Sequence, residues 1–517
     1  MRKAKIEYYD CLISSSLSNP AKFWNAVNLL KPKASSALPT HLRVNNHDVL
    51  GETNICHAFN SHFADAGLLF DQRFRSTVTS SVVSSECLSD VCFSFNPVCQ
   101  QEVLHQLLSI NPKCSTGEDN LESFFIRLAA PLIAESLTYI FNLSISSGKF
   151  PLLWKSTHVT PLFKGGDRDN LDNYRPISKL PCLAKVLETL INNQLKRFLS
   201  AHSVLSPHQS GFRANHSTIS AITLVTNDII TALDKKQHCA ALFVDLSKAF
   251  DTVDHQILLN RLKNIGLHAS ACDWFSDYLS SRRQCVKSGN FQSEFLPVTK
   301  GVPQGSVLGP VLFTIYINDI LSSLNDCHAH LYADDTILYC ITDSVQLATE
   351  KLQISFNVLQ EALINLKLVL NERKTKFMLF SCSRNLGCTN VLLSTKDGSL
   401  IERVTEYKYL GLWLDDKLTF KFHINVLAST LRQKVGFLYR NRSYFSLISR
   451  KRIVESLILS VLDYGDIIYR HAAITTLKPL DSIYHSALRF ITGDRYDTHH
   501  CVLYEKVGWS SLSDRGM

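Results

Sequence analysis

The sequence predicts an α+β fold, in which long helices and short strands are mixed along the chain. Long segments such as 121–147 carry apolar residues at helical spacing, whereas the short run Cys239–Val244 is continuously apolar, as in a buried strand. No internal repeat is visible. The mixture of the two patterns favours the α+β class.

The first hundred residues are predicted to be only partly ordered. Residues 1–30 have helical spacing with scattered basic residues, and Lys31-Pro32 closes that helix. Residues 33–100 are rich in Ser and irregular, apart from a helical patch near Ile55–Phe70. The stretch Ser76–Ser89 consists mostly of Ser, Thr and Val, and it is our candidate for a linker or a poorly ordered loop.

From Gln101 onward, regular elements follow one another closely. Apolar spacing predicts the helices, and short apolar or β-branched runs predict the strands. The C-terminal region Phe420–Phe490 is expected to be mainly helical. The other expected helices are 101–110, 121–147, Leu183–Leu199 and Ser217–Asp234, and the expected strands are Lys155–Lys164, Cys239–Val244, Gly289–Thr299 and His330–Ala333.

Length, charge and cysteine spacing limit the class of protein. The 517 residues suffice for three or four packed units, and 45% of them are hydrophobic. A formal net charge of +8 fits a protein that follows a phosphate backbone, although many other proteins are as basic. None of the 15 cysteines forms a CxxC pair, so we expect reduced thiols and no structural zinc site.

Two features bear on location in the cell. Residues 1–10 are charged and do not resemble a secretory signal. No run reaches the roughly 18 apolar residues that a membrane span needs. We therefore expect an intracellular protein of the cytoplasm, the nucleus or both, neither secreted nor held in a membrane.

Three carboxylates are the strongest chemical signal. Asp245 follows the apolar run Ala240–Val244, so a buried strand would hold it stiffly at its end. Asp334 and Asp335 lie between two strand-like runs and are expected at the tip of a hairpin. An isolated Asp-Asp pair is usually a solvated turn, and adjacent carboxylates repel unless a cation lies beside them. The apolar flanks and the third acid favour a site for two Mg²⁺ ions, which prefer oxygen ligands and for which Mn²⁺ can substitute.

These acids lie among motifs that occur in one order along the chain. From about Phe150 to Gly411, the sequence resembles the reverse transcriptases of non-LTR (LINE-type) retrotransposons. The motifs that carry the resemblance are Trp154–Lys164, Asn173–Ser178, Gln209–Arg213, Asp245–Asp251, Gly301–Ser306, the YADD box Tyr332–Asp335, Leu370–Thr375 and Tyr409–Gly411.

The resemblance implies a right-hand polymerase with fingers, palm and thumb. The implied activity is RNA-directed DNA synthesis, by two-metal nucleotidyl transfer onto a primer 3′-hydroxyl. The implied partners are an RNA template, a DNA primer and deoxynucleoside triphosphates, with no protein partner evident. The implied divisions are an N-terminal extension or linker (1–100), fingers and upstream helices (101–235), a palm (236–411) within a reverse transcriptase domain of about 145–411, and a thumb-like helical region (412–517) that we expect to be truncated.

The resemblance also assigns roles to single residues. It implies that Asp245, Asp334 and Asp335 are catalytic and bind the metal ions. It further implies that Lys164 and Arg175 hold the triphosphate, the arginine through a bidentate fork and the lysine as a point charge. The alternative for these two cations is an exposed surface position without a ligand.

Three more residues are assigned to the nucleotide. By resemblance, Gln304 lines the nucleotide pocket, in a bend between two glycines where backbone can approach a nucleotide closely. Phe250 would lie under the sugar and exclude a 2′-hydroxyl, and Lys374 would assist the departing pyrophosphate. The alternatives are a structural turn, core packing and a surface lysine, respectively. We interpret the neighbouring Asp251 as a structural helix cap.

The remaining assignments concern the nucleic acid. Arg213, Tyr409 and Gly411 are implied to contact template and primer. Because binding through phosphates and sugars releases counterions, we expect affinity to fall steeply with salt.

Two alternatives from other classes stay open. A decayed retroelement copy could still bind RNA without polymerising, although the intact acids argue against decay. A splicing factor similar to group II intron maturases would share the polymerase core, but the segment Val461–Gly465 looks like a LINE thumb. Residues 1–110 contain no endonuclease-like constellation of acids and histidine, and the sequence after Gly411 resembles neither an RNase H nor a Cys/His knuckle.

Overall fold

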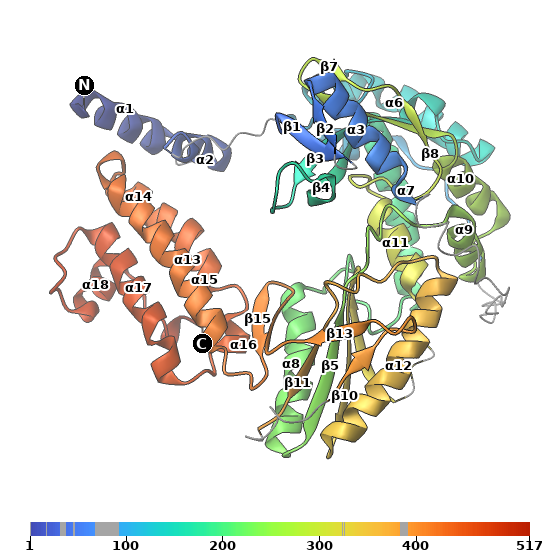
Figure 1. Ribbon diagram of the computed structural model, residues 1–517. Helices are drawn as coiled ribbons and strands as arrows, with labels where there is room; N and C mark the ends of the chain where they lie inside the picture. Colours follow the sequence, from blue (N-terminus) through green and yellow to red (C-terminus); the bar gives the residue numbers. More distant parts are fainter. Residues whose placement is uncertain are drawn as a thin grey trace.

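The computed structural model describes residues 2–16, 18–30, 38–44, 47–67, 92–322, 324, 326–382 and 391–516. Helices and two larger β-sheets are mixed along the chain, which confirms the predicted α+β class (Figure 1). The predicted linker Ser76–Ser89 lies outside the described residues.

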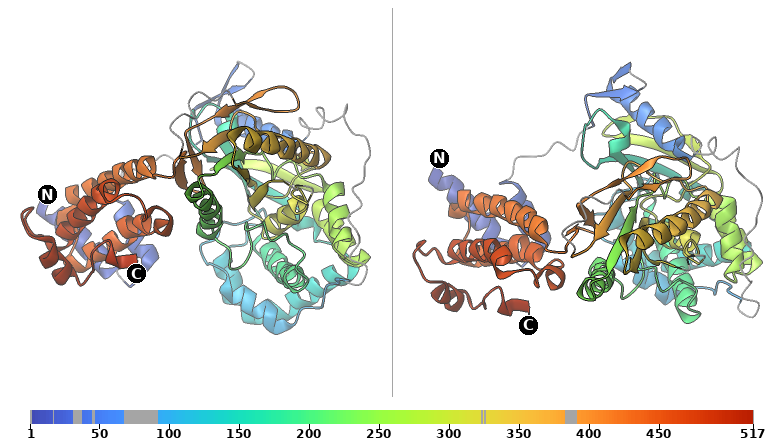
Figure 2. Two further views of the ribbon diagram at one scale, coloured as in Figure 1. Left: turned by 90° about the horizontal axis from the view of Figure 1, so that it is seen from below. Right: turned by 60° about the horizontal axis from the view of Figure 1, so that its bottom comes forward.

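The first two helices pack against the last helices of the chain. The predicted single helix over 1–30 is wrong, because the structure has two, α1 (Arg2–Ser15) and α2 (Pro20–Asn28). Pro20 has no N–H to donate, and the Asn19 side chain accepts an amide of the first turn and caps α2. Apolar residues of both helices lie in one core with the C-terminal helices, so both ends of the chain belong to one helical body (Figure 2).

The segment predicted to be irregular contains a hairpin before its helix. Phe59 of that helix packs edge-on against Tyr174, with ring centroids 4.7 Å apart, and this contact anchors the helix to the sheet that follows. The helix agrees with the predicted patch, whereas the Ser-rich pattern gave no sign of the strands. The elements are β1 (His41–Val44), β2 (His47–Leu50) and α3 (Glu52–Ala64).

A five-stranded sheet comes next, with the order β4-β3-β6-β7 and with β8 also paired to β6. The predicted strand Gly289–Thr299 is two short strands, β7 and β8, which both turn back onto β6. The strands are β3 (Ser156–Phe163), β4 (Tyr174–Lys179), β6 (Arg282–Ser288), β7 (Phe291–Gln292) and β8 (Leu296–Val298).

Helices beside this sheet share a core in which Trp274 and Tyr278 are fully buried. Glu188 is also fully buried there; it accepts from the Tyr278 hydroxyl at 3.0 Å and from the Val307 amide at 2.6 Å. The helices are α5 (Gln100–Ser109), α6 (Ser123–Ser147), α7 (Cys182–Ala201), α9 (His255–Asn264) and α10 (Ala269–Leu279).

A six-stranded sheet, with the order β12-β13-β11-β5-β10-β9, carries the predicted acids. Alternate residues of β5 enter two different cores, one shared with α12 and one with α8, so these helices lie on opposite faces of the sheet (Figure 1). The elements are α8 (Thr218–Asp234), β5 (His238–Val244), α11 (Gly309–Ile317), β9 (His328–Tyr332), β10 (Asp335–Thr342), α12 (Val345–Asn365), β11 (Lys376–Phe380), β12 (Leu393–Ser394) and β13 (Leu400–Arg403).

The C-terminal region is mainly helical, as predicted. A separate hairpin connects it to the six-stranded sheet, and its core is the one that α1 and α2 join. The elements are β14 (Glu406–Tyr409), β15 (Leu412–Asp415), α13 (Lys421–Arg440), α14 (Leu447–Val454), a π-helical turn (Glu455–Leu459), α15 (Ser460–Leu462), α16 (Asp466–Tyr469), α17 (Ile474–Thr492) and α18 (His500–Val507).

Helix α6 is long and apolar enough to cross a membrane, judged by length and composition alone. The expectation concerned an uninterrupted run of about 18 apolar residues, and in α6 Arg127 and Glu135 interrupt the apolar run. One side of α6 is buried in the core through residues such as Phe141, while the other side exposes Leu128 and Leu132. Because core helices of soluble proteins pass the same test, the composition of one helix is weak grounds for a membrane span.

Candidate active site

The three predicted acids come together at one end of the six-stranded sheet. Strands β9 and β10 form a hairpin whose two-residue turn is Ala333-Asp334, and Asp335 follows at the start of β10. Ala333 has φ +57°, a left-handed conformation that tight hairpin turns require. In the ladder between β5 and β10, Val244 pairs with Thr336. Asp245 follows the first of these residues and Asp335 precedes the second, so the two acids are cross-strand neighbours.

Burial raises the pKa of all three acids, and neighbouring acids raise the pKa of Asp334 and Asp335 further. Burial, together with the charges of Asp334 and Asp245, raises the pKa of Asp335 to about 6. The pKa of Asp334 is raised by burial and by Asp245, and that of Asp245 by burial. Asp335 still has an exposed side chain that a ligand can reach. A cation between the three carboxylates would stabilise their charged forms.

The turn that carries Asp334 is held by residues of the Gln209–Arg213 motif. The fully buried Gln209 accepts through Oε1 from the Gly211 amide at 2.7 Å and from the Ala333 amide at 3.3 Å. A Cβ added to Gly211 would lie 2.2 Å from the Ala333 nitrogen, so only glycine allows this approach. The motif therefore fixes the position of the acid-bearing turn.

Arg213 takes part in the fold of the same motif. Its Nη1 donates to the carbonyl oxygens of Ser206 and Gln209, at 2.9 and 3.3 Å. The guanidinium has five N–H groups, so others are left for a phosphate. The template contact of Arg213 stays a prediction.

Lys164 and Arg175 lie on one hairpin that faces the acids. In the β3–β4 ladder Arg175 pairs with Leu162, and Lys164 lies two residues further along on the same face as Leu162. Against the raising effect of burial, the charge of Arg175 lowers the pKa of Asp334 and of Asp335. Lys164 lowers that of Asp334 as well.

Two more lysines join this positive group. Burial lowers the pKa of Lys164, and the charges of Arg175, Lys374 and Lys248 lower it further. Lys374 also lowers the pKa of Asp245, against the effect of burial. The structure thus brings three predicted cations together with the acids, and it adds Lys248, which the sequence did not single out.

Gln304 binds an acid of the first catalytic motif. Its Nε2 donates to Asp251 Oδ1 at 2.8 Å, and burial raises the pKa of Asp251 to about 6. The prediction that Asp251 caps a helix is wrong. Helix α9 is capped by Asp254, whose Oδ1 accepts from the amides of Gln256 and Ile257, because Asp254 directly precedes the first helical residue.

Two glycines bring the Gln304 loop against other protein segments. A Cβ on Gly301 would lie 2.8 Å from the Asp251 carbonyl oxygen, and one on Gly305 would lie 2.6 Å from that of Ser178. Both glycines have positive φ, +79° and +119°. The two glycines were predicted to let backbone approach a nucleotide. In the structure, Gly301 and Gly305 instead approach the backbone of other protein segments.

Phe250 is only half-buried. Its ring stacks on Phe313 of α11, with centroids 4.3 Å apart, and meets Phe212 edge-on at 6.1 Å. The core therefore holds the ring without covering all of it. Selection against a 2′-hydroxyl by Phe250 stays a prediction.

The predicted primer contacts lie at the turn of the β14–β15 hairpin. Tyr409 is buried beside Phe243, and its hydroxyl has no hydrogen-bond partner in the described part of the chain. Gly411 has φ +95°, and a Cβ there would lie 3.0 Å from the Tyr464 ring. The Tyr464 hydroxyl bonds to the Leu410 carbonyl oxygen at 2.7 Å, so the C-terminal body fixes this turn.

Comparison with known families gives the context of this site. A family model described as reverse transcriptase (RNA-dependent DNA polymerase) matches residues 164–414, a range that includes every residue predicted for the site. Residues 164–414 belong to the reverse transcriptase family.

The reverse transcriptase domain has curated relatives among mobile elements of flies. The chain is 32% identical over 404 residues to the RNA-directed DNA polymerase from mobile element jockey of Drosophila melanogaster, which covers 76% of this chain and 44% of that protein. The jockey protein of Drosophila funebris is 30% identical over 441 residues, covering 82% and 48%. The probable RNA-directed DNA polymerase from transposon BS of Drosophila melanogaster is 28% identical, covering 81% and 47%. The chain thus spans about half the length of these relatives.

Two residues near the reverse transcriptase acids were not predicted from the sequence. The Gln209–Arg213 motif was recognised in the sequence, but no role was predicted for Gln209 itself. Its side chain holds the acid-bearing turn. Lys248 lies between the two acids of the first catalytic motif, and that position is a signal from which it could have been found.

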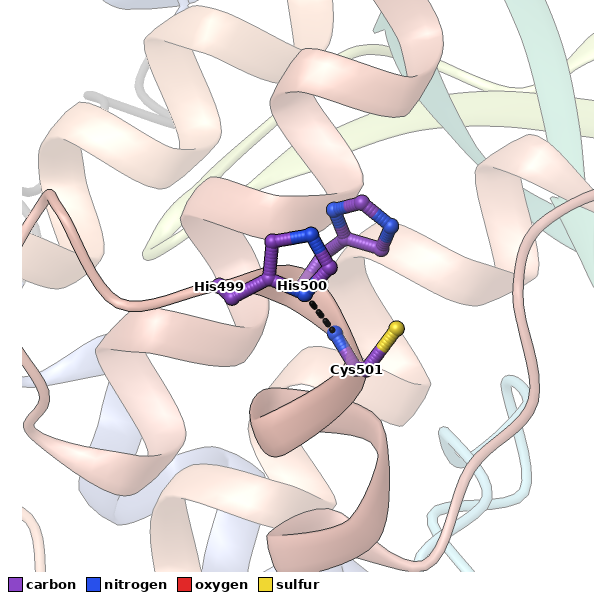
Figure 3. A group of neighbouring side chains, drawn as sticks. All are labelled: His499, His500 and Cys501. Carbon is purple, nitrogen blue, oxygen red and sulfur yellow. Dashed lines mark hydrogen bonds between the residues drawn. The ribbon is translucent and has the colours of Figure 1, made fainter.

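One group of potential metal ligands lies outside the reverse transcriptase domain, at the start of α18. The ligand atoms of His499, His500 and Cys501 lie within 4.8 Å of one another (Figure 3). His499 Nδ1 accepts the Cys501 amide and caps the helix, so the proton of the neutral ring is on Nε2. Since neither nitrogen of His499 is then available to a metal, we assign this group no ion.

Proposed function

We propose that the chain is an RNA-directed DNA polymerase of a non-LTR retrotransposon. The observation that carries this proposal is the meeting of Asp245, Asp334 and Asp335 at one end of the six-stranded sheet, near Lys164 and Arg175. The names of the fly relatives support it, since each is an RNA-directed DNA polymerase or a probable one. Because its substrates are intracellular, we also propose that it acts in the cytoplasm, the nucleus or both.

In this proposal the chain is a right hand. We assign 101–235 to the fingers, 236–411 to the palm and 412–517 to the thumb, with 1–100 as an extension. The template would be RNA and the primer DNA. The packing of α1 and α2 on the C-terminal helices, and of α3 on the β3–β4 sheet, means that the extension contributes to both the thumb and the fingers.

The donor set fits two Mg²⁺ ions. Three carboxylates whose pKa values are raised, by burial in each case and also by neighbouring acids for Asp334 and Asp335, supply hard oxygen ligands and excess negative charge. Asp245, Asp334 and Asp335 would hold the ions, and Mn²⁺ could replace them. When bound, the ions would lower the pKa of the primer 3′-hydroxyl and stabilise the charge on the departing pyrophosphate.

The chain's own residues orient the reactants. In the step, the primer 3′-oxygen bonds to the α-phosphorus, the bond from that phosphorus to the bridging oxygen breaks, and pyrophosphate leaves with the electron pair while the hydroxyl proton passes to water. Lys164 and Arg175 would hold the triphosphate, and Lys374 would stabilise the leaving group. Gln304 and Phe250 would line the nucleotide pocket.

The nucleic acid would be held by residues on both sides of the acids. Arg213 lies in the motif that braces the acid-bearing turn, and Tyr409 and Gly411 lie at the hairpin turn fixed by the C-terminal body. In this arrangement the template and the primer 3′ end would meet between these two turns.

The proposal is tested by extending a DNA primer on an RNA template with the purified chain, with Mg²⁺ and with a chelator. We expect DNA synthesis that needs the metal. Asp334→Asn should lower the rate at least ~10³-fold, because it removes a metal ligand, while leaving template binding nearly intact. A variant that keeps a tenth of wild-type activity would show that this acid is not a ligand.

The same experiment separates the two rival functions. A decayed RNA-binding copy would bind the primed template but make no DNA in the presence of Mg²⁺. A maturase-like protein would accelerate splicing of an intron RNA, and this activity would survive Asp334→Asn. Synthesis that disappears with Asp334 excludes the first rival and leaves polymerase as the function of the site.

A further inference from the structure

A histidine from outside the family-matched region reaches the first catalytic motif. Its Nε2 is 2.9 Å from the Lys248 Nζ, and both atoms lie 3.3 Å from Asp172 Oδ1. This histidine is His62, near the end of α3. The side chains of His62 and Lys248 are 18% and 25% exposed, whereas that of Asp172 is 68% exposed, so the group opens to solvent on the Asp172 side.

The protonation states in this group follow from its chemistry. An ammonium group only donates, so a short contact with an imidazole nitrogen requires that nitrogen to accept. Burial, with the charge of Lys248, lowers the pKa of His62 to about 4 and keeps the ring neutral. Lys248 therefore donates to His62 Nε2 and forms an ion pair with Asp172, and its ammonium has further N–H groups for another acceptor.

The position of α3 is fixed by its packing. Phe59 and Phe63 of this helix are buried in one core with Tyr174 of β4. Just after the helix, a Cβ added to Gly67 would lie 2.8 Å from the Lys300 Cβ and 3.2 Å from the Asp251 carbonyl oxygen. The helix is thus packed against the catalytic motif itself.

The backbone of Lys248 is also held in an unusual conformation. Its φ is +49°, which few residues other than glycine adopt. Such conformations persist where the surroundings fix them, and they cluster at functional sites. The backbone conformation and the contacts of the ammonium group together fix the orientation of the Lys248 side chain.

The charges around Lys248 favour an anionic ligand. Lys164 is close enough to Lys248, Arg175 and Lys374 that their charges lower its pKa, in addition to the effect of burial. Lys164, Arg175 and Lys374 each lower the pKa of at least one acid that would hold the metal ions. Lys248 adjoins this group, since its charge acts on Lys164 and on Asp251. A nucleoside triphosphate carries the negative charge and the phosphate oxygens that such a group binds.

We propose that Lys248 binds a phosphate group of the incoming nucleoside triphosphate, and that His62 and Asp172 position its ammonium group for this contact. The inference rests on the proposed function, because it concerns the same nucleotide site. It makes a helix that precedes the family domain part of that site.

The test compares variants of the full chain in single-nucleotide primer extension. Lys248→Met should raise the KM for the nucleotide about ten- to hundredfold, because a charge-assisted hydrogen bond is lost, with a smaller change in kcat. His62→Ala should raise it about three- to tenfold, and His62→Gln, whose Oε1 can accept from Lys248, should recover most of the loss. Affinity for primed template should stay unchanged in all three.

His57→Ala is the matched control. His57 lies on the same helix, about one and a half turns earlier, and so points from another face. It should leave the KM unchanged. The double variant of His62→Ala and Lys248→Met should behave like Lys248→Met alone, because a positioning residue acts only through the lysine. Melting temperatures close to wild type are required of each variant.

Two results would overturn the inference. The first is an unchanged nucleotide KM in a folded Lys248→Met variant. The second is a double variant in which His62→Ala raises the nucleotide KM as much as it does when Lys248 is present. Calorimetric binding of Mg²⁺–nucleotide to a complex with a 3′-deoxy primer needs no turnover, so it measures the Lys248 contact even if no DNA is made. Failure of wild-type synthesis would instead count against the proposed function.

Discussion

Replacing Gly211 by alanine tests whether the acid-bearing turn must lie where the Gln209–Arg213 motif holds it. The added Cβ would lie 2.2 Å from the Ala333 nitrogen and 2.9 Å from its Cα, whereas ordinary contacts begin at 3.4 Å. Both are backbone atoms, so no side-chain rotation relieves the overlap, and one segment must move by about 1 Å. Since a misplacement of about 1 Å can lower a rate about 10²-fold, we expect a loss of that order in kcat.

The assay is a single-turnover incorporation of one nucleotide on a preformed primer–template complex. Template affinity and melting temperature are measured beside it, because the glycine is not expected to contact nucleic acid. Gly436→Ala in α13 is a matched control, since its Cβ would meet only the flexible Arg440 guanidinium, at 3.4 Å. If folded Gly211→Ala works within threefold of the wild-type rate, the turn tolerates displacement and our reasoning about the motif is wrong.

Four other outcomes follow from the site. Phe250→Val should raise ribonucleotide incorporation by about one to a few orders of magnitude, because a roomier pocket admits both sugars. If a variant with the wild-type melting temperature uses ribonucleotides no better than the wild type, Phe250 is a core residue only. Arg175→Ala should raise the nucleotide KM more than it weakens binding of primed template, and equal weakening would instead indicate a nucleic-acid contact. Because burial and its neighbouring acids raise the pKa of Asp335 to about 6, Mg²⁺ affinity measured by titration should fall as pH falls through that value, and a flat profile would contradict the coupling. The same raised pKa makes the charged carboxyl destabilising without metal, so the metal-free protein should gain stability as pH falls through about 6, and Asp335→Asn should raise its melting temperature at neutral pH.

The elements that carry the acids could be predicted because the signal lies within each strand. The apolar run before Asp245 and the runs on both sides of the YADD box are local patterns, and β5, β9 and β10 agree with the predictions to within a few residues. Grouping the three acids needed the register of two ladders, which the residue types alone do not specify.

Contacts between distant segments could not be predicted in the same way. His62 meets Lys248 across a separation of 186 residues, and nothing in the Ser-rich first hundred residues points toward the catalytic motif. The break between α1 and α2 was predictable in principle, since Asn19-Pro20 combines a capping residue with a residue that lacks an N–H. The prediction that Asp251 caps a helix failed because the exact first residue of a helix is the least certain part of a pattern, and the cap lies three residues later at Asp254.

The shared core of the first and last helices has a consequence for synthesis. Ser14 of α1 bonds to Ser446 across 432 residues, and Phe23 of α2 lies in one core with Ile453. At about 5–20 residues per second, a ribosome finishes the partner helices roughly 20–90 s after α1 has left it. Through that interval the apolar sides of α1 and α2 lack the C-terminal helices that bury them in the folded chain. Helices α1 and α2 thus wait for their packing partners until the C-terminal helices are made, although both precede the sheets in the sequence.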